Sequence, residues 1–296
     1  MNRMRRTALF IPGNNPGMLQ NAGILGADSV ILDLEDAVSL TEKDSARILV
    51  REAIKNVDFC GTEVLVRINP LTGPYGESDI DTIGRVKPDA LLVPKADEDQ
   101  IRTADERLSK IEREQGFESG SIKLIPLVES AYGIEKVYDI IRSSSRCIAV
   151  LFGGEDYTAD MGVKRTKEGQ EIEYARNRVA VACKSCGMDS FDTPFTDVED
   201  TSGLKADTLK ARNLGYTGKA AINPRQVTVI HGAYAPEKAE IRHAQRVMEA
   251  MEDAEREGKG VFSLDGKMVD APIISRARQT LDLAKRLGMI TSGGSI

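Results

Sequence analysis

The stretch IPLVESAYG (residues 125–133) is apolar until it reaches Glu129, and IAVLFGGEDY (residues 148–157) is apolar until it reaches Glu155 and Asp156. Both runs place apolar side chains at successive positions, which is typical of parallel strands covered on both faces. A strand that ends on a carboxylate delivers that group to the edge of its sheet. Two consecutive strands of this kind predict a pair of carboxylates at one edge, where they can hold a metal ion.

Six further runs resemble these two. They lie at residues 7–13, 29–36, 63–69, 90–97, 190–195 and 218–224. Helical patterns such as residues 41–55 and 98–116 separate the runs, so that strand and helix alternate eight times. This order predicts an α/β protein whose residues 1–235 form a TIM (β/α)8 barrel, with an open doubly wound sheet as the alternative.

The pattern changes after about Pro236. A long polar helix is expected at residues 237–258, followed by a hairpin at 261–270 with Asp-Gly at its turn, and a last helix at 271–288. Residues 236–296 are therefore predicted to be a C-terminal helical extension with a hairpin, outside the barrel.

Composition and charge limit the partners and the compartment. The net charge is −6 and the sequence pI is about 5.3, which gives no basic footprint for nucleic acid. The apolar run near the N-terminus covers only Ala8–Ile11, and no stretch approaches the roughly 20 apolar residues that cross a bilayer. We therefore expect a cytoplasmic protein that acts on small molecules or proteins. The CxxC pair Cys183 and Cys186 lacks a second pair, so both are expected to be reduced structural thiols.

The barrel prediction places a set of polar side chains around one mouth, because the C-terminal ends of barrel strands share one face. The expected set is Asp33, Glu35, Asp36, Arg67, Asn69, Lys95, Glu129, Asp156, Asp192 and Asn223. A rim this rich in carboxylates repels itself unless a cation is present. Since the set contains neither histidine nor cysteine, oxygen ligands dominate and Mg²⁺ is favoured over zinc.

Many short motifs occur together in this sequence and carry a resemblance. In order they are FIPGNNPGM, ADSVILDLEDAV, EKDSAR, VRIN, VPKAD, VESAYGI, GGEDY, FDTPFTD, GYTGKAAINPRQ and DGKMVDAP. Running from about Thr7 to past Asp270, they resemble the citrate lyase β subunit family and the related malyl-CoA and citramalyl-CoA lyases. The resemblance implies a Mg²⁺-dependent lyase that cleaves a citryl thioester, on acyl carrier protein or CoA, into oxaloacetate and an acetyl thioester. It also implies association with a citrate lyase α subunit and an acyl carrier protein subunit.

The resemblance further implies roles for individual residues. Glu129 and Asp156 would bind Mg²⁺, and Arg67 would grip the keto acid in a fork of hydrogen bonds. From the residues themselves, backbone N–H groups around Gly153 and Gly154 are expected to approach a ligand closely, because glycine has no side chain; Gly154 and Glu155 are assigned to substrate binding. These residues are our candidate active site.

The resemblance also implies a role for Asp270, on the C-terminal extension. The extension would close over the barrel of a neighbouring subunit, and Asp270 would serve there in acid–base chemistry at the acetyl carbon. This role requires a homo-oligomer. Locally, Asp270 is also a good N-cap for the helix that follows, with Pro272 in the first turn.

Each assignment has an alternative. Glu129 and Asp156 are also placed to cap helices, and Arg67 is placed to pair inside the barrel with Glu35 or Asp36. Those two carboxylates are candidates for holding Arg67 or a metal-bound water from behind, or for a purely structural role. Two other classes of protein stay open: a metal-free aldolase that forms a Schiff base on Lys95, and a noncatalytic binding barrel.

Overall fold

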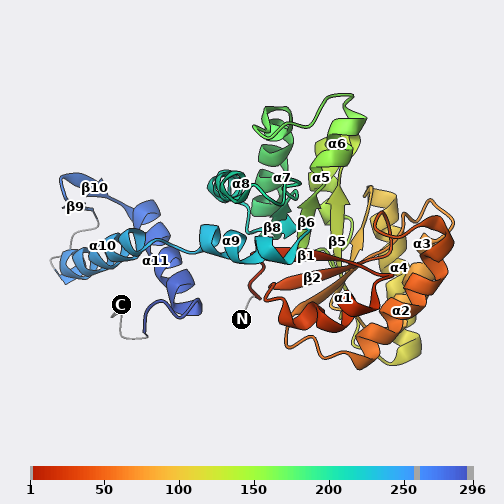
Figure 1. Cartoon of the computed structure of the whole chain (residues 1–296). Helices are drawn as coiled ribbons and strands as arrows, with labels where there is room; N and C mark the ends of the chain where they lie inside the picture. Colours follow the sequence, from red (N-terminus) through yellow and green to blue (C-terminus); the bar gives the residue numbers. More distant parts are fainter. Residues whose placement is uncertain (1–2, 257–260, 292–296) are drawn as a thin grey trace. The chain divides into compact units, whose positions relative to one another are not determined.

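Eight parallel strands close into a barrel at the centre of the fold (Figure 1). The computed structural model describes residues 3–256 and 261–291. The barrel strands are β1 (Thr7–Pro12), β2 (Ser29–Asp33), β3 (Glu63–Arg67), β4 (Ala90–Val93), β5 (Lys123–Val128), β6 (Ala149–Phe152), β7 (Asp189–Asp192) and β8 (Gly218–Ala221). The predicted TIM barrel is confirmed, and the open doubly wound sheet is excluded because β1 pairs with both β2 and β8.

The interior of the barrel is a packed apolar core. Its buried residues are Ala8, Ile31, Leu65, Ala90, Leu92, Ile125, Leu127, Ala149, Leu151, Phe191 and Ala220. Since side chains alternate along a strand, the residues between these point outward to the helices. A barrel filled in this way leaves only its rim for a ligand.

Helices cover the outside of the barrel (Figure 1). They are α1 (Pro16–Asn21), α2 (Lys43–Asn56), α3 (Gly76–Ile83), α4 (Glu98–Gln115), α5 (Ala131–Arg142), α6 (Gly154–Asp160), α7 (Glu173–Ser185), α8 (Thr201–Leu214) and α9 (Pro224–Tyr234). Short 3₁₀ helices are η1 (Ala22–Ile24), η2 (Leu40–Glu42), η3 (Gly84–Val86) and η4 (Gln170–Ile172). Side chains of Asp97, Ser130 and Asp200 cap α4, α5 and α8, whereas Gly153 begins α6 without a side-chain cap.

The chain divides into two compact units, residues 1–231 and 232–296. The elements that lie wholly within the second unit are α10 (Lys238–Arg256), β9 (Phe262–Leu264), β10 (Lys267–Val269) and α11 (Ala271–Arg286). A small apolar core of Ala244, Val247, Val269 and Ala277 holds the two helices and the hairpin together. The predicted last residues of the first of these helices, 257–258, lie outside the described part of the chain.

The hairpin of the second unit turns at Asp265 and Gly266. Both residues have positive φ, 52° and 75°, which a two-residue turn of type I′ requires and which an Asp-Gly pair tolerates. Asp270 follows β10 and caps α11, accepting a hydrogen bond from the N–H of Ile273 at 3.3 Å. The local geometry thus agrees with the capping role expected from the sequence.

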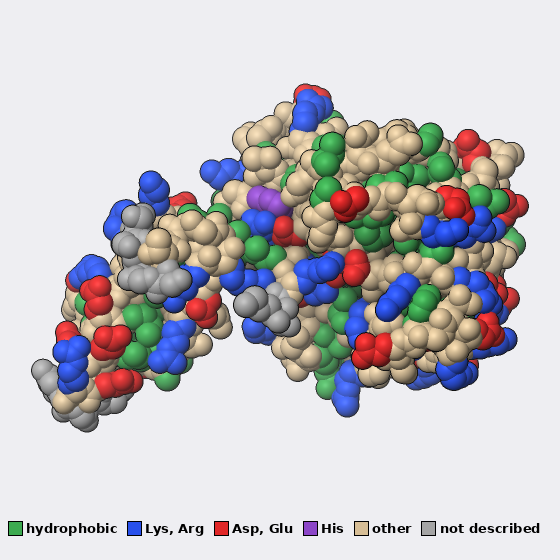
Figure 2. Space-filling view, turned by 90° about the horizontal axis from the view of Figure 1, so that it is seen from below, with side chains coloured by type: hydrophobic (Ala, Val, Ile, Leu, Met, Phe, Trp, Pro, Cys, Tyr) green, Lys and Arg blue, Asp and Glu red, His purple; other side chains and the backbone are tan. Residues whose placement is uncertain are grey.

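The surface carries both signs of charge. In Figure 2, basic and acidic side chains are interspersed over the face shown. Within residues 3–256 and 261–291, no helix has the length and apolar character that a membrane span needs. Cys183 is buried, which raises the pKa of its thiol to about 12 and opposes thiolate chemistry.

Candidate active site

Arg67 is held at the mouth of the barrel by a carboxylate on the neighbouring strand. Asp33 ends β2, Arg67 ends β3, and the register of the two strands places them opposite each other. Asp33 accepts two parallel hydrogen bonds, from Nε to Oδ1 and from Nη2 to Oδ2, each 2.7 Å long. Burial by itself would lower the pKa of Arg67, but the hydrogen bonds and charge of Asp33 raise it overall. The sequence predicted Asp33 at the rim but not its pairing with Arg67. The signal for this pairing is that both residues end neighbouring strands of the barrel.

The remaining nitrogen of the guanidinium, Nη1 of Arg67, faces two more carboxylates. It lies 2.8 Å from Oε2 of Glu35 and 3.3 Å from Oδ2 of Asp36. The contact with Glu35 is not aligned as a hydrogen bond, so this buried oxygen has no hydrogen-bond partner in the described part of the chain. Burial raises the pKa of Glu35 to about 7; the charge of Arg67 opposes the rise, and the charges of Asp36 and Asp33 add to it. The side chain of Asp36 is 67% exposed and is free to move aside.

Glu129 follows β5 and points into the mouth from a buried position. The residue is only 4% exposed, and its Oε1 accepts a hydrogen bond from the backbone N–H of Lys95 at 2.7 Å. The carboxylate of Asp156 is a neighbour of Glu129 and lines the same cavity. Burial, and after it the negative charge of the neighbouring Asp156, raises the pKa of Glu129 to about 9.

Asp156 lies in the first turn of α6, and two glycines bring this turn against Glu129. The N–H of Gly153 donates to the carbonyl of Val128 at 3.0 Å. A Cβ at Gly153 would lie 2.7 Å from the Cβ of Glu129, so only glycine fits there. The N–H of Gly154 donates to Oγ1 of Thr193 at 2.9 Å. The expectation that this N–H is available to a substrate is therefore wrong, because a hydroxyl on the next strand's loop already uses it.

The pair of carboxylates suits a hard divalent cation. Two neighbouring carboxylates repel each other unless one is protonated or a cation lies between them, and this repulsion adds to burial in raising the pKa of Glu129. Mg²⁺ is commonly bound by one or two carboxylates and keeps its other positions for water and substrate oxygens. Within residues 3–256 and 261–291 no group of three or more His, Cys, Asp or Glu side chains is gathered as a metal site. Oxygen donors and a low ligand count fit Mg²⁺ better than zinc.

One cavity of about 130 Å³ joins these groups. Its lining consists of Phe10, Asp36, Arg67, Leu127, Glu129, Leu151, Gly153, Gly154, Glu155, Asp156, Thr193 and Pro194. The ring of Phe10 lies 4.9 Å from the guanidinium carbon of Arg67, which favours the cation and limits its swing. The cavity thus combines apolar walls with one cation and several carboxylates, as small-molecule sites commonly do.

Other residues expected at the mouth are engaged elsewhere. Asp192 is fully buried beneath the helices and pairs with Arg176 and Lys219, so its prediction as a rim residue is wrong. Phe191 takes the inward position on β7, and alternation then turns Asp192 outward. Asn69 donates to the carbonyl of Leu34 and to Asp79.

Two further candidates keep local roles. The side chain of Lys95 is exposed, and its backbone N–H serves Glu129. Asp270 belongs to the second compact unit, where its side chain caps α11.

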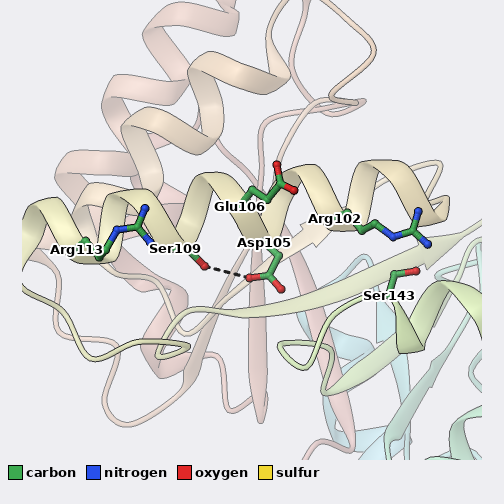
Figure 3. A pocket seen from close by; sticks show the side chains of 6 residues that line it. All are labelled: Arg102, Asp105, Glu106, Ser109, Arg113 and Ser143. Carbon is green, nitrogen blue, oxygen red and sulfur yellow. Dashed lines mark hydrogen bonds between the residues drawn. The ribbon is translucent and has the colours of Figure 1, made fainter.

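A larger surface depression of about 460 Å³ lies along α4 and is unrelated to the strand ends (Figure 3). Its lining residues are Arg102, Asp105, Glu106, Ser109, Arg113 and Ser143. Figure 3 shows Ser109 hydrogen-bonded to Asp105 along the helix, at 3.2 Å. All the residues that line this depression are charged or polar, with both signs of charge, so the barrel mouth is the better candidate site.

Comparison with known proteins places this geometry among enzymes. The sequence profile of the HpcH/HpaI aldolase/citrate lyase family matches residues 6–224. The chain is 41% identical to citrate lyase subunit beta of Leuconostoc mesenteroides subsp. cremoris, over 99% of this chain and 97% of that protein. It is 30% identical to human mitochondrial citramalyl-CoA lyase, over 95% of this chain and 85% of that protein.

A solved structure is also similar. CitE from Mycobacterium tuberculosis in complex with magnesium, acetoacetate and coenzyme A superposes with a TM-score of 0.81 at 26% sequence identity. The match covers 95% of this chain and 98% of that one. The likeness extends beyond the residues that the family profile matches and into the second unit.

Proposed function

We propose, from the fact that the chain belongs to the HpcH/HpaI aldolase/citrate lyase family, that it is a Mg²⁺-dependent carbon–carbon lyase acting on a citryl thioester. The products are oxaloacetate and an acetyl thioester. The observation that carries the proposal is the pairing of Glu129 with Asp156 in the same cavity as the anchored Arg67. One end of this cavity suits a cation and the other suits a carboxylate, which is what an alcohol flanked by carboxylates needs.

In this proposal Glu129 and Asp156 hold Mg²⁺. When bound, the ion supplies positive charge where the alcohol oxygen becomes the ketone of oxaloacetate. Burial and the neighbouring Asp156 raise the pKa of Glu129 to about 9, which favours its protonated form in the absence of a cation. Binding of the ion would displace that proton. The hydrogen bond from the backbone N–H of Lys95 fixes the orientation of the Glu129 carboxyl group.

Arg67 is proposed to bind the carboxylate of the oxaloacetate half. Asp33 occupies its Nε and one N–H of Nη2, so the guanidinium is locked with its Nη edge toward the cavity. The substrate carboxylate would replace the long, exposed contact of Asp36 with Nη1. Phe10 beneath the guanidinium keeps that edge in place. Lysine could not reproduce this arrangement, because it lacks a planar pair of donors.

Gly154 and Glu155 are proposed to lie beside the substrate. The backbone N–H of Gly154 does not donate to it in this proposal. With its N–H engaged by Thr193, Gly154 contributes space, since a side chain there would collide with Thr193. Glu155 lines the cavity and follows Gly154 on α6.

The proposed role of Asp270 requires a second copy of the chain, and further subunits are proposed as partners. We propose that Asp270 completes the site of a neighbouring copy, as acid or base at the acetyl carbon, within a homo-oligomer. The barrel unit and the extension are proposed as the two domains, with residues 1–235 and 236–296. An α subunit and an acyl carrier protein would be the further partners, and a cytoplasmic location likewise stays a prediction.

The direct test is turnover of a panel of hydroxyacyl thioesters with and without Mg²⁺. We expect citryl thioester cleavage that a chelator abolishes and Mg²⁺ restores, with oxaloacetate as the measured product. Turnover that survives the chelator, with enzyme trapped by borohydride in the presence of substrate, would instead indicate a Schiff base on Lys95. Metal binding without turnover of any thioester would favour a noncatalytic barrel.

A related reaction is the second candidate. The identity to citramalyl-CoA lyase extends over 95% of the chain, so the same groups could serve a substrate with a methyl group in place of one carboxymethyl arm. The cavity has both apolar walls and charged groups, which suit either arm. The same panel decides between them through the ratio of kcat/KM for citryl-CoA and citramalyl-CoA.

A further inference from the structure

The start of α6, which carries Asp156, lacks the usual means of anchoring. The first N–H groups of a helix have no partner within the helix, and a polar N-cap side chain commonly accepts one of them. Here the N-cap is Gly153, and an added Cβ would lie 2.8 Å from Oε2 of Glu129 as well as against its Cβ. The packing of one proposed metal ligand therefore excludes a capping side chain for the helix that bears the other.

Thr193 supplies the missing acceptor from a different strand. Its Oγ1 accepts the N–H of Gly154, the first residue of α6, at 2.9 Å. The contact is tight, since a Cβ on Gly154 would lie 2.9 Å from the same Oγ1. Thr193 is 1% exposed and follows directly after β7, so its hydroxyl has little freedom to move.

A buried ionic cluster supports Thr193 from the side away from α6. Lys219 is fully buried, and its Nζ donates to the carbonyl of Thr193 at 2.7 Å. The same Nζ binds Asp192 at 2.5 Å and Asp207 at 2.6 Å. Arg176, also fully buried, donates to both of these aspartates. Two cations and two anions thus balance, and breaking such a buried set is costly, so the backbone of Thr193 is a rigid support.

We propose that Thr193 is a positioning residue for the Mg²⁺ site, which rests on the function proposed above. Its hydroxyl fixes the first turn of α6 and thereby the separation of Asp156 from Glu129. The support runs from the ionic cluster through the carbonyl and hydroxyl of Thr193 to Gly154. Without the hydroxyl, the turn is anchored on the barrel by the Gly153 to Val128 hydrogen bond, and the two carboxylates are held less closely.

The test measures Mg²⁺ affinity of the full chain without substrate, by calorimetric titration. Thr193→Val replaces the hydroxyl by a methyl group, and Thr193→Ser keeps the hydroxyl while removing the methyl group. We expect Thr193→Val to bind Mg²⁺ about 10 to 100 times more weakly, as is typical for losing a group that orients a ligand, and Thr193→Ser to bind as wild type. Because substrate is absent, a direct contact of Thr193 with substrate cannot produce the difference.

Controls separate this proposal from folding effects and from the proposed function. Thr193→Ala lacks the hydroxyl but adds no bulk, so it replaces Thr193→Val if that variant shows an altered unfolding transition. Wild-type affinity in the folded hydroxyl-free variant, or equal loss in Thr193→Ser, overturns the positioning role. Wild-type protein that binds no Mg²⁺, or binding unchanged in Glu129→Gln, overturns the metal site itself and with it both proposals.

Discussion

Two buried arginines, Arg67 at the barrel mouth and Arg146 at the opposite end, show how the same side chain serves different purposes. Arg146 precedes β6 and donates to Asp105, Glu112, Ser109 and the carbonyl of Ile122, with distances from 2.6 to 2.9 Å. Every nitrogen has an aligned partner, and the side chain is 3% exposed. This cluster is closed, and nothing in it is left for a ligand.

The cluster at the mouth is arranged differently. Asp33 takes two hydrogen bonds from Arg67, but Nη1 meets Glu35 without alignment and Asp36 only at 3.3 Å. Incomplete pairing next to a cavity is what a binding site needs, because a ligand must gain contacts that the protein does not already make. The comparison teaches that a buried arginine is a candidate for function when its partners leave one edge open.

The largest expected effect is at the two proposed metal ligands, which line the same cavity as Arg67. Glu129→Gln and Asp156→Asn should each lose Mg²⁺ binding and reduce turnover by about a thousandfold or more while the protein stays folded, because a charged ligand is removed. Calorimetric titration with Mg²⁺ and steady-state turnover measure the two effects. Wild-type titrations in both variants would contradict the metal site and remove the functional difference between the two clusters.

The mouth, unlike the closed cluster, is also expected to be completed by another copy of the chain. Asp270→Asn should lower kcat by about 100-fold to 10,000-fold if the residue is the acid or base, although asparagine still caps α11. A mixture of Asp270→Asn chains and Glu129→Gln chains should then regain activity, since some interfaces combine an intact barrel with an intact aspartate. A nearly active Asp270→Asn protein contradicts the catalytic role, and no recovery after verified subunit mixing contradicts the shared site.

Exchanging each arginine for lysine tests the contrast directly. Arg67→Lys should lower kcat/KM by about 10-fold to 100-fold, because lysine keeps the charge but loses the planar donors. Arg146→Lys, its matched control, should lower the unfolding temperature and leave Mg²⁺ affinity and KM unchanged. Activity assays and thermal melts on both variants measure this. Near-normal turnover with Arg67→Lys would make both arginines structural.

The smallest effect is a pH dependence of stability at the closed cluster. Burial opposes ionisation of Glu112, but hydrogen bonds from Arg146 and from the N–H groups of Ile122 and Gly120 lower its pKa to about 2. A lowered folded-state pKa stabilises the protein above about pH 4.5, and this stabilisation is lost as the pH falls toward 2. Glu112→Gln should therefore show a flatter decline of unfolding free energy over that window. Denaturant titrations at several pH values measure it, and parallel curves for both proteins would contradict it.

Much of the molecule followed from sequence patterns. The apolar runs predicted all eight strands and the barrel, because parallel strands buried on both faces need apolar residues at consecutive positions. The Asp-Gly pair at Asp265 predicted the hairpin, since few other residue pairs accept two positive φ values. The sequence also placed Glu129 at the mouth, because the C-terminal ends of all barrel strands lie at the same end of the barrel.

Tertiary structure alone decided which polar groups pair and which stay open. Asp33 rather than Glu35 forms the fork with Arg67, because the register of β2 and β3 aligns those two positions. Asp192 points to the helix layer, because its neighbour Phe191 fills the core. Local patterns state which residues a strand carries, whereas hydrogen-bond pairing depends on where neighbouring strands and helices place their atoms. The sequence therefore determined the barrel and its acidic rim, whereas only the tertiary structure brings the hydroxyl of Thr193, which follows β7, to the N–H of Gly154 at the start of α6.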